Sequence, residues 1–328
     1  MKKSLLALAV LGAFAGAASA QTNVSIYGVA DVGIQRTDTS ATSATWGLNS
    51  GIWSGSRIGF KGSEDLGGGL SAIFQLENGF SIDTGALGTA NTLFNRQAFV
   101  GLKGGFGALT FGRQYSPYHI ALDTIDPFET GLAGDTTRLF ASHLTTGYPI
   151  RVSNSIVYAA PAMGGLSASV IYGLGETAGS ISDNSQLGVG AGYANGPLNV
   201  QFAYHTTNVT AAGADTDHST LLLGGKFNFG VAALHAGFAD NKNEVAGGSN
   251  KARNYLLGVT APVGAGVIRA SWVRNDLRGG NLTDADQYAI GYTHGLSKRT
   301  DLYTSYARTN VDVGADVNIF NVGIRHKF

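Results

Sequence analysis

Apolar and polar side chains alternate in short segments from residue 25 to the C-terminus. In the last segment, Phe320, Val322 and Ile324 fall on one parity, whereas Asn321 and Arg325 fall on the other. Because successive side chains of a β-strand point to opposite faces, such a segment can present one face to lipid and the other to water. A soluble β-sandwich shows similar alternation, so the pattern alone predicts a β protein of either kind.

The alternation predicts sixteen strands, most of them near the 9–11 residues that a tilted strand needs to cross lipid. These strands lie near residues 23–36, 54–64, 69–78, 94–104, 108–114, 153–160, 166–174, 186–194, 198–206, 217–229, 231–239, 252–261, 266–275, 286–294, 301–309 and 316–328.

The connections between these strands are alternately short and long. The short ones, such as Asn195-Gly196-Pro197, carry Gly or Asn for a tight hairpin turn. The long polar ones lie near residues 37–53, 79–93, 115–152, 175–185, 207–216, 240–251, 276–285 and 310–315. This alternation places all short turns at one rim and all long loops at the other, and a sandwich offers no reason for it. We therefore predict an all-β fold, a 16-stranded antiparallel transmembrane β-barrel, which is wide enough for an aqueous channel.

The first twenty residues have the pattern of a signal peptide. Lys2 and Lys3 precede an apolar run that ends in the small-residue stretch Ala18-Ser19-Ala20. The apolar run is shorter than the roughly 20 residues of a transmembrane helix. We expect residues 1–20 to be removed and residues 21–328 to form a single barrel domain in the cell outer membrane.

Composition excludes several kinds of protein. Without the two lysines of the signal peptide, 20 basic residues stand against 22 acidic ones, so the chain has no charge excess for binding nucleic acid. Cysteine is absent, which excludes disulfides and thiolate metal sites. The sequence has no Gly-x-Ser-x-Gly or Gly-x-Gly-x-x-Gly motif, and His205, His235 and His294 stand singly on different predicted strands. We expect no enzyme activity, no cofactor and no metal.

The third long connection, residues 115–152, differs from the others in its length and its apolar content. It contains Ile120, Leu122, Phe128, Leu132 and Phe140 among its polar residues. A connection of this length in a compact protein is usually functional or disordered, and its apolar side chains need a surface to cover them. The inner barrel wall is the available surface, so we expect this loop to fold into the lumen.

Several stretches resemble the general diffusion porins of Gram-negative outer membranes, especially the proteobacterial ones. The matching stretches are Ile26-Tyr27-Gly28-Val29-Ala30-Asp31, Ser56-Arg57-Ile58-Gly59-Phe60-Lys61-Gly62-Ser63-Glu64-Asp65-Leu66-Gly67-Gly68-Gly69-Leu70, Asn95-Arg96-Gln97-Ala98-Phe99-Val100-Gly101-Leu102, Phe111-Gly112-Arg113-Gln114, Ala261-Pro262-Val263-Gly264, Gly295-Leu296-Ser297-Lys298-Arg299-Thr300 and Val322-Gly323-Ile324-Arg325-His326-Lys327-Phe328. The resemblance covers essentially the whole mature chain.

The resemblance implies a homotrimer of barrels, each narrowed by its third loop, in which acidic loop residues face a basic wall. It assigns to the basic wall Arg57, Lys61, Arg96 and Arg113. It assigns to the loop Asp123, Asp126, Glu129, Asp135 and Arg138. The terminal Phe328 resembles the family's signal for the barrel assembly machinery. Outer-membrane lipid, lipopolysaccharide, small hydrophilic solutes and ions are the other partners that it implies.

Strand parity supports these positions unevenly. Arg57 and Lys61 have the parity opposite to Ile58 and Phe60, which directs them to the lumen. An arginine on the lipid face would cost roughly 2–4 kcal/mol at the membrane midplane. Arg96 shares its parity with apolar residues, so alternation leaves its side undecided.

The predicted activity is passive diffusion of ions and small hydrophilic solutes through a water-filled channel, selected by width and fixed charge. The acidic loop residues nearly match the basic wall in number, so the sequence leaves open whether cations or anions are preferred. A substrate-specific channel, a barrel enzyme and an adhesin are the alternatives. Inward aromatic candidates such as Tyr27 and Tyr303 are few for a sugar path, and no segment remains for an adhesin domain.

Overall fold

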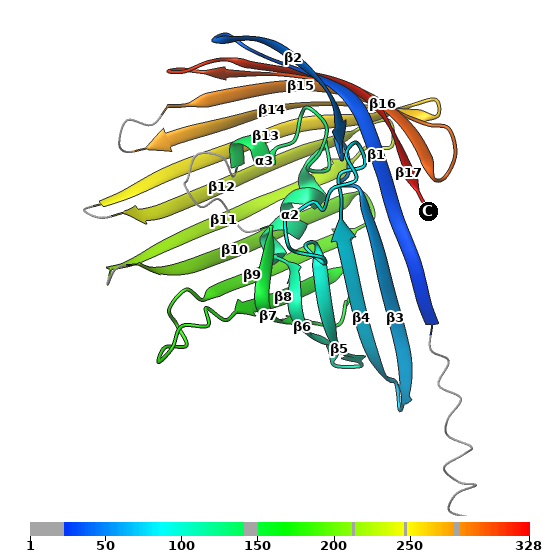
Figure 1. Ribbon diagram of the computed structural model, residues 1–328, viewed down its shortest axis with the longest axis vertical. Coiled ribbons are helices and arrows are strands. Elements are labelled where there is room, and N and C mark those ends of the chain that lie inside the picture. The colour runs from blue at the N-terminus through cyan, green and yellow to red at the C-terminus, as the bar shows by residue number, and fades with distance from the viewer. Residues whose placement is uncertain (1–22, 141–149, 212–213, 246–247, 279–282) are drawn as a thin grey trace, which may run out of the picture.

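The barrel wall encloses two short helices (Figure 1). The computed structural model describes residues 23–140, 150–211, 214–245, 248–278 and 283–328, so the predicted signal peptide lies outside the described residues. No helix in these ranges is long and apolar enough to cross a membrane.

Seventeen strand segments build the wall. They are β1 (Asn23–Thr39), β2 (Thr42–Ser50), β3 (Arg57–Gly67), β4 (Leu70–Gly79), β5 (Gln97–Gly104), β6 (Gly107–Tyr115), β7 (Arg151–Ala159), β8 (Leu166–Gly173), β9 (Gln186–Asn195), β10 (Leu198–Ala211), β11 (Ala214–Asn228), β12 (Ala233–Val245), β13 (Gly248–Val263), β14 (Gly266–Arg278), β15 (Ala285–Gly295), β16 (Thr300–Val311) and β17 (Val317–Lys327).

The wall closes by pairing of its first and last strands. β1 pairs with β17 from Val29↔Lys327 to Thr39↔Val317, and apart from β2 each strand pairs antiparallel with the next. β2 and β3 follow one another along the same side of β1, so they count as one wall strand. The prediction of a closed, 16-stranded antiparallel barrel is therefore confirmed.

The second wall strand is interrupted, which the sequence did not predict. β2 lies inside the stretch 37–53 that we expected to be a loop, and the irregular segment 51–56 separates it from β3. The carboxylate of Asp31 on β1 organises this break, because its Oδ2 accepts from the backbone N–H groups of Trp53 at 3.1 Å and Ser54 at 2.7 Å. Ser56 Oγ in turn donates to the Asp31 carbonyl oxygen at 3.0 Å.

Other expected loops are also partly strand. Much of the ranges 207–216, 240–251 and 276–285 belongs to the strands β10 to β15, which continue as paired hairpins. These polar stretches lack the apolar alternation from which strands were predicted. Antiparallel pairing satisfies their backbone groups in any surroundings, so alternation marks the part of a strand that faces lipid and not its full length.

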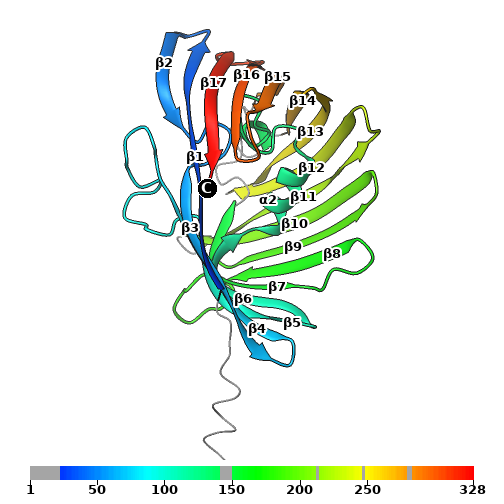
Figure 2. The ribbon, with the colours of Figure 1, turned by 90° about the vertical axis from the view of Figure 1, so that its right-hand side faces the viewer.

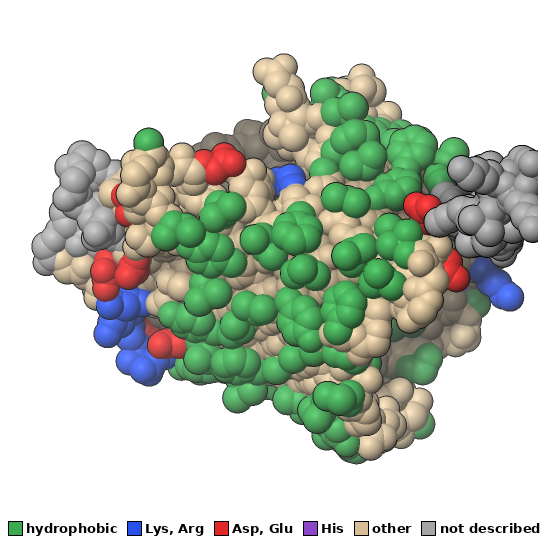
Figure 3. All heavy atoms as spheres, turned by 90° about the horizontal axis from the view of Figure 1, so that it is seen from below, with side chains coloured by type: hydrophobic (Ala, Val, Ile, Leu, Met, Phe, Trp, Pro, Cys, Tyr) green, Lys and Arg blue, Asp and Glu red, His purple; other side chains and the backbone are tan. Residues whose placement is uncertain are grey.

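Hydrophobic side chains cover the outer surface of the wall. Val100, Phe111, Leu257 and Ile290 are all exposed, on four different strands. Figure 3 shows one face of the molecule, on which hydrophobic side chains are spread broadly while charged side chains gather toward its edges. A surface of this kind is suited to a lipid environment.

The third loop folds into the barrel, as predicted. It contains α2 (Pro117–Ile125) and α3 (Thr137–Phe140), which lie within the ring of strands (Figures 1 and 2). Ser116 caps α2 by accepting from the His119 N–H at 3.1 Å, and Pro117 occupies the first helical turn, where its missing N–H is not needed. Residues 141–149 of the predicted loop lie outside the described residues.

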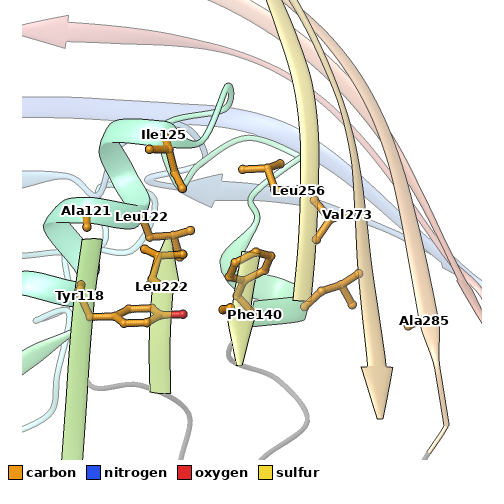
Figure 4. Packing of buried hydrophobic residues seen from close by; sticks show 12 residues of the cluster. Tyr118, Ala121, Leu122, Ile125, Phe140, Leu222, Leu256, Val273 and Ala285 are labelled. Atoms are coloured by element: carbon orange, nitrogen blue, oxygen red, sulfur yellow. The ribbon is translucent and has the colours of Figure 1, made fainter. Parts of the chain in front are cut away.

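Apolar packing fixes the loop against one side of the wall. Tyr118, Ala121, Leu122 and Ile125 of α2 are buried together with side chains of the strands β10 to β15 (Figure 4). The strand residues of this cluster are Ala203, Leu222, Ala239, Leu256, Val273 and Ala285. Full burial of one large apolar side chain contributes about 1.5–3 kcal/mol, so the cluster is a strong attachment. The remaining lumen therefore lies beside the loop.

Candidate functional site

A cavity of about 1480 Å³ lies between the third loop and the opposite wall. Residues 194–199 around a short turn also line it, so it extends toward the rim of short turns. Its basic lining residues are Arg57, Arg96, Arg151, Lys226, Arg269, Arg325 and Lys327. Its acidic ones are Glu77, Asp123, Asp126 and Glu129. The lining thus carries seven basic against four acidic side chains.

Three arginines, Arg57, Arg96 and Arg151, form what we call the arginine wall. Two of them, Arg57 and Arg96, share one carboxylate, that of Glu77 on β4. Glu77 Oε1 lies 2.7 Å from Arg96 Nε, and Glu77 Oε2 lies 3.8 Å from Arg57 Nε. Tyr27 also donates its hydroxyl to Glu77 at 2.9 Å. The Glu77 carboxylate thus holds two members of the wall by charge-assisted contacts.

The phenol of Tyr115, at the start of the loop, joins the other side of the wall. Its oxygen accepts from Arg96 Nη2 at 2.6 Å and from Arg151 Nη2 at 2.8 Å. The Arg151 guanidinium also lies 4.5 Å from the centre of the Tyr115 ring. Within the described residues Arg151 makes no ion pair. One neutral side chain therefore holds two like charges close together.

His119 of α2 completes this side of the cavity. Its ring stacks on Tyr115 with 5.1 Å between ring centres. Burial, together with the positive charges of Arg151 and Arg96, lowers the pKa of His119 to about 4. At neutral pH this imidazole is uncharged, so the positive field here comes from the arginines.

Asp126 serves the structure of the loop. It is buried, and its carboxylate accepts from the backbone N–H groups of Phe128 at 2.9 Å, Thr130 at 3.0 Å and Thr136 at 3.2 Å. Burial raises the pKa of Asp126 to about 7, with Asp135 adding to the shift. Around neutral pH Asp126 is therefore only partly ionised, and it offsets less of the positive charge than its formal charge suggests.

The remaining acidic loop residues differ in their exposure to the cavity. Glu129 Oε1 lies 3.5 Å from Arg269 Nη1 on β14, and its side chain is half exposed. Asp123 lines the cavity and accepts from the Thr130 hydroxyl at 2.7 Å. Asp135 accepts from the N–H and the hydroxyl of Thr137 and does not line the cavity.

A second basic group surrounds Trp53 in the break between β2 and β3. The guanidinium carbon of Arg325 lies 3.2 Å from the centre of the Trp53 rings, and that of Arg269 lies 5.2 Å away. Arg325 also pairs with Asp301 at 2.9 Å. We call Trp53, Arg269 and Arg325 the tryptophan clamp.

The structure brings together only some of the predicted site residues. Arg57, Arg96, Asp123, Asp126 and Glu129 line the cavity. The cavity lining does not include Lys61, Arg113, Asp135 or Arg138. The Lys61 ammonium lies 5.1 Å from the centre of the Tyr27 ring, and Arg113 donates to the Asn95 carbonyl oxygen and to Ser153 Oγ. Arg138 is exposed in the four-residue helix α3.

Sequence reasoning missed Glu77, Arg151, Arg269 and Arg325 as site residues. Arg269 and Arg325 have the polar parity of their strands, which was a usable signal for the lumen. Arg151 fell inside the range assigned to the loop, where parity gives no direction. Glu77 alternates with neighbours of mixed polarity, and its partners come from other strands.

The terminal Phe328 lies at the closure of the barrel. The Phe328 N–H donates to the Gly28 carbonyl oxygen at 3.1 Å, and the Gly28 N–H donates to the Phe328 carbonyl oxygen at 2.9 Å. A Cβ at position 28 would lie 2.2 Å from Phe328 Cζ, so only glycine leaves room for the ring. The residue thus contributes to the pairing of the first and last strands.

Comparison with known proteins gives consistent matches over the whole chain. The model of the Gram-negative porin family matches residues 7–314. An outer membrane porin protein of Bordetella pertussis is 32% identical over 391 residues, and outer membrane porin protein 32 of Delftia acidovorans is 34% identical over 357 residues. Both matches cover 100% of this chain and 100% of the relative.

Solved structures give the same result for the fold. The anion-selective porin from Comamonas acidovorans has a TM-score of 0.84 and 31% identity, over 94% of this chain and 100% of that one. The trimer form of OmpT from Vibrio cholerae, with a TM-score of 0.68 and 15% identity over 94% of this chain and 99% of that one, shares the fold.

Proposed function

The chain belongs to the Gram-negative porin family and forms a water-filled diffusion channel in the outer membrane, and we propose that this channel favours small anions. The relatives are channels rather than enzymes, and the proposed activity is diffusion without catalysis. Fixed charge at the narrow part of a pore selects ions by attracting counter-ions and repelling co-ions.

The observation that carries the proposal is the excess of basic side chains around the cavity. Seven basic residues face four acidic ones there, and Asp126 is only partly ionised. The mature chain has no such excess, since its 20 basic residues are outnumbered by 22 acidic ones. The positive charge is therefore concentrated where solutes pass. A structural relative with 31% identity is described as anion-selective, which agrees with this preference.

The arginine wall is the part that we assign to ion selection. Arg57 and Arg96 keep 22% and 14% of their side-chain surface exposed, and Arg151 has no carboxylate partner among the described residues. These charges act over roughly the Debye length, about 8 Å at physiological salt. Anion preference should accordingly weaken as the salt concentration rises.

Assembly and export are further parts of the proposal. We propose that residues 1–20 are removed on export, that residues 21–328 form the barrel domain and that three copies associate as a trimer. The match to a family of outer-membrane proteins supports all three. Phe328 at the barrel closure is the proposed signal for the assembly machinery, and outer-membrane lipid with lipopolysaccharide is the proposed surrounding of the apolar outer face.

The test is the zero-current potential of the purified protein in a planar bilayer under a potassium chloride gradient. We expect a potential of the sign for chloride preference, and a shift toward cation preference in Arg57→Ser. Arg308→Ser is the matched control, because Arg308 belongs to β16, has a half-exposed side chain and does not line the cavity. A wild-type potential of the cation-preferring sign would contradict the proposed preference, whereas equal shifts in both variants would contradict the role of Arg57.

A further inference from the structure

The tip of the third loop has a backbone that needs external support. Glu129, Thr130 and Leu132 have φ angles of 56°, 48° and 58°, in the left-handed region. Such conformations are strained for residues other than glycine, and for a bulky residue they are uncommon. They persist only when surrounding contacts hold them, so the structure must contain a feature that holds this tip.

The break between β2 and β3 provides these contacts. The Leu132 N–H donates to the Ile52 carbonyl oxygen at 2.7 Å. Gly131 approaches the same segment so closely that a Cβ there would lie 2.1 Å from the Trp53 carbonyl oxygen. The loop tip and the segment 51–56 are therefore in direct backbone contact, and the close approach requires glycine at position 131.

The Trp53 side chain joins this contact to the wall. It is buried with Phe128 and Leu132 of the loop and with Tyr303 of β16. The Trp53 and Tyr303 rings meet edge to face, with 6.1 Å between their centres. Tyr303 donates its hydroxyl to Asp31 Oδ1 at 2.7 Å, and Asp31 Oδ2 holds the backbone of Trp53. Wall, break and loop tip thus form one connected packing unit.

The same indole ring contacts both guanidinium groups of the tryptophan clamp, Arg325 at 3.2 Å and Arg269 at 5.2 Å from the ring centre. Arg269 donates to the Pro127 carbonyl oxygen of the loop at 3.1 Å and to Thr293 Oγ1 on β15 at 3.2 Å. The face of a tryptophan ring stabilises a cation that lies over it. Removal of the indole would take this ring contact from both arginines and leave one side of the loop tip without its packing partner.

We propose that the segment 51–56 is a second constriction element, and that Trp53 is a positioning residue that holds the loop tip at a fixed distance from the wall. The break in the second wall strand brings both the backbone of residues 51–56 and the Trp53 side chain to the lumen. An uninterrupted strand would stay in the wall and reach the lumen only with its inward side chains. The width and steadiness of the opening depend on this contact. The proposal rests on the channel function, and it does not depend on the anion preference proposed above.

The test compares Trp53→Ala with Trp53→Phe, and with Trp46→Ala as a matched control. Trp46 on β2 is 64% exposed and takes no part in this packing. Open-channel current noise and the largest neutral sugar that enters liposomes report on loop position. We expect severalfold higher noise and a larger limiting sugar for Trp53→Ala, near wild-type values for Trp53→Phe, and no change for Trp46→Ala.

A second variant leaves the indole in place. Gly131→Ala adds a methyl group that meets the Trp53 backbone, and we expect the same direction of change in noise and sugar size. Gly105→Ala, where a Cβ meets nothing within 4 Å, is its control. Wild-type noise and wild-type sugar exclusion in folded Trp53→Ala, or in Gly131→Ala if the former does not fold, would overturn the proposal. Because neutral sugars and noise do not report ion preference, failure here is distinguishable from failure of the anion test.

Discussion

The arginine wall and the tryptophan clamp contain similar side chains in different surroundings. Arg57 and Arg96 of the wall keep 22% and 14% of their side-chain surface exposed, whereas Arg269 and Arg325 of the clamp keep 4% and 8%. Arg57 and Arg96 share one carboxylate and Arg151 pairs with none among the described residues, whereas each arginine of the clamp has a carboxylate of its own. Within one cavity, positive charge that outnumbers its carboxylates and stays partly exposed can act on solutes, while individually paired and more deeply buried charge serves the packing of the loop.

The largest effect that would sharpen this comparison is expected from Glu77→Gln. The change removes the single negative charge among the three arginines while keeping the shape of the side chain. At separations of several ångströms one unit charge is worth about 1 kcal/mol after screening, so we expect the anion-to-cation permeability ratio to rise about fivefold. The zero-current potential under a salt gradient measures this ratio.

Asp301→Asn is the control for that change, because it removes one negative charge from beside Arg325 in the clamp. We expect a clearly smaller change in the permeability ratio from it. Equal effects of the two substitutions would mean that the clamp contributes to ion selection as much as the wall does, and the distinction between the two groups would then be wrong.

A smaller effect on selectivity, with a larger one on stability, is expected from Arg269→Met. Methionine keeps much of the length of the side chain but loses the stacking on Trp53 and the hydrogen bonds to Pro127 and Thr293. We expect destabilisation by about 1–3 kcal/mol. The half-exposed partner Glu129 can be solvated, so the loss of the ion pair itself adds little. Thermal unfolding in detergent and open-channel noise measure the effect.

Arg57→Met is the matched substitution in the wall. Arg57 lies 3.8 Å from its carboxylate partner and keeps 22% of its side-chain surface exposed, whereas Arg269 lies 3.5 Å from its partner and keeps 4%. We therefore expect Arg57→Met to shift the zero-current potential more, and the unfolding temperature less, than Arg269→Met does. If Arg269→Met shifted the potential more and Arg57→Met lowered the unfolding temperature more, the assignment of ion selection to the wall and of loop packing to the clamp would be wrong.

Most of the fold could be predicted because lipid imposes a strict alternation on each strand. The polar ends of β12 and β13, at residues 240–245 and 248–251, could not be predicted as strand. Neither of their faces shows the apolar alternation that contact with lipid imposes. The break at 51–56 also gave no signal, because it depends on Asp31, whose partners Trp53 and Tyr303 are distant in the chain. Alternation predicts where a strand crosses lipid, and tertiary contacts decide where it stops.

The site was predictable to the extent that parity determines direction. Arg57 lies on the lumen side, where parity placed it. Arg96 precedes β5 and turns to Glu77 although its parity in the sequence is that of outward residues, because alternation does not govern a residue outside the strand. The pairing of Glu77 with two arginines arises only when β3, β4 and the start of β5 lie side by side. No local pattern contains that information.

The smallest expected effect concerns His119, which faces Tyr115, Arg96 and Arg151 of the wall. Burial and the two arginines lower its pKa to about 4, below the ordinary value of about 6.5. Between about pH 6.5 and 4 the unfolded chain binds a proton at His119 and the folded protein does not. The free energy of unfolding therefore falls as the pH falls through this range. The positive charge of His119 joins the wall only below about pH 4. We expect wild type and His119→Gln to give equal zero-current potentials from pH 7 to 5, and wild type to become more anion-preferring than the variant below pH 4. A difference between them already at pH 6 would mean that the imidazole is charged beside the arginines, and that its burial does not keep it neutral.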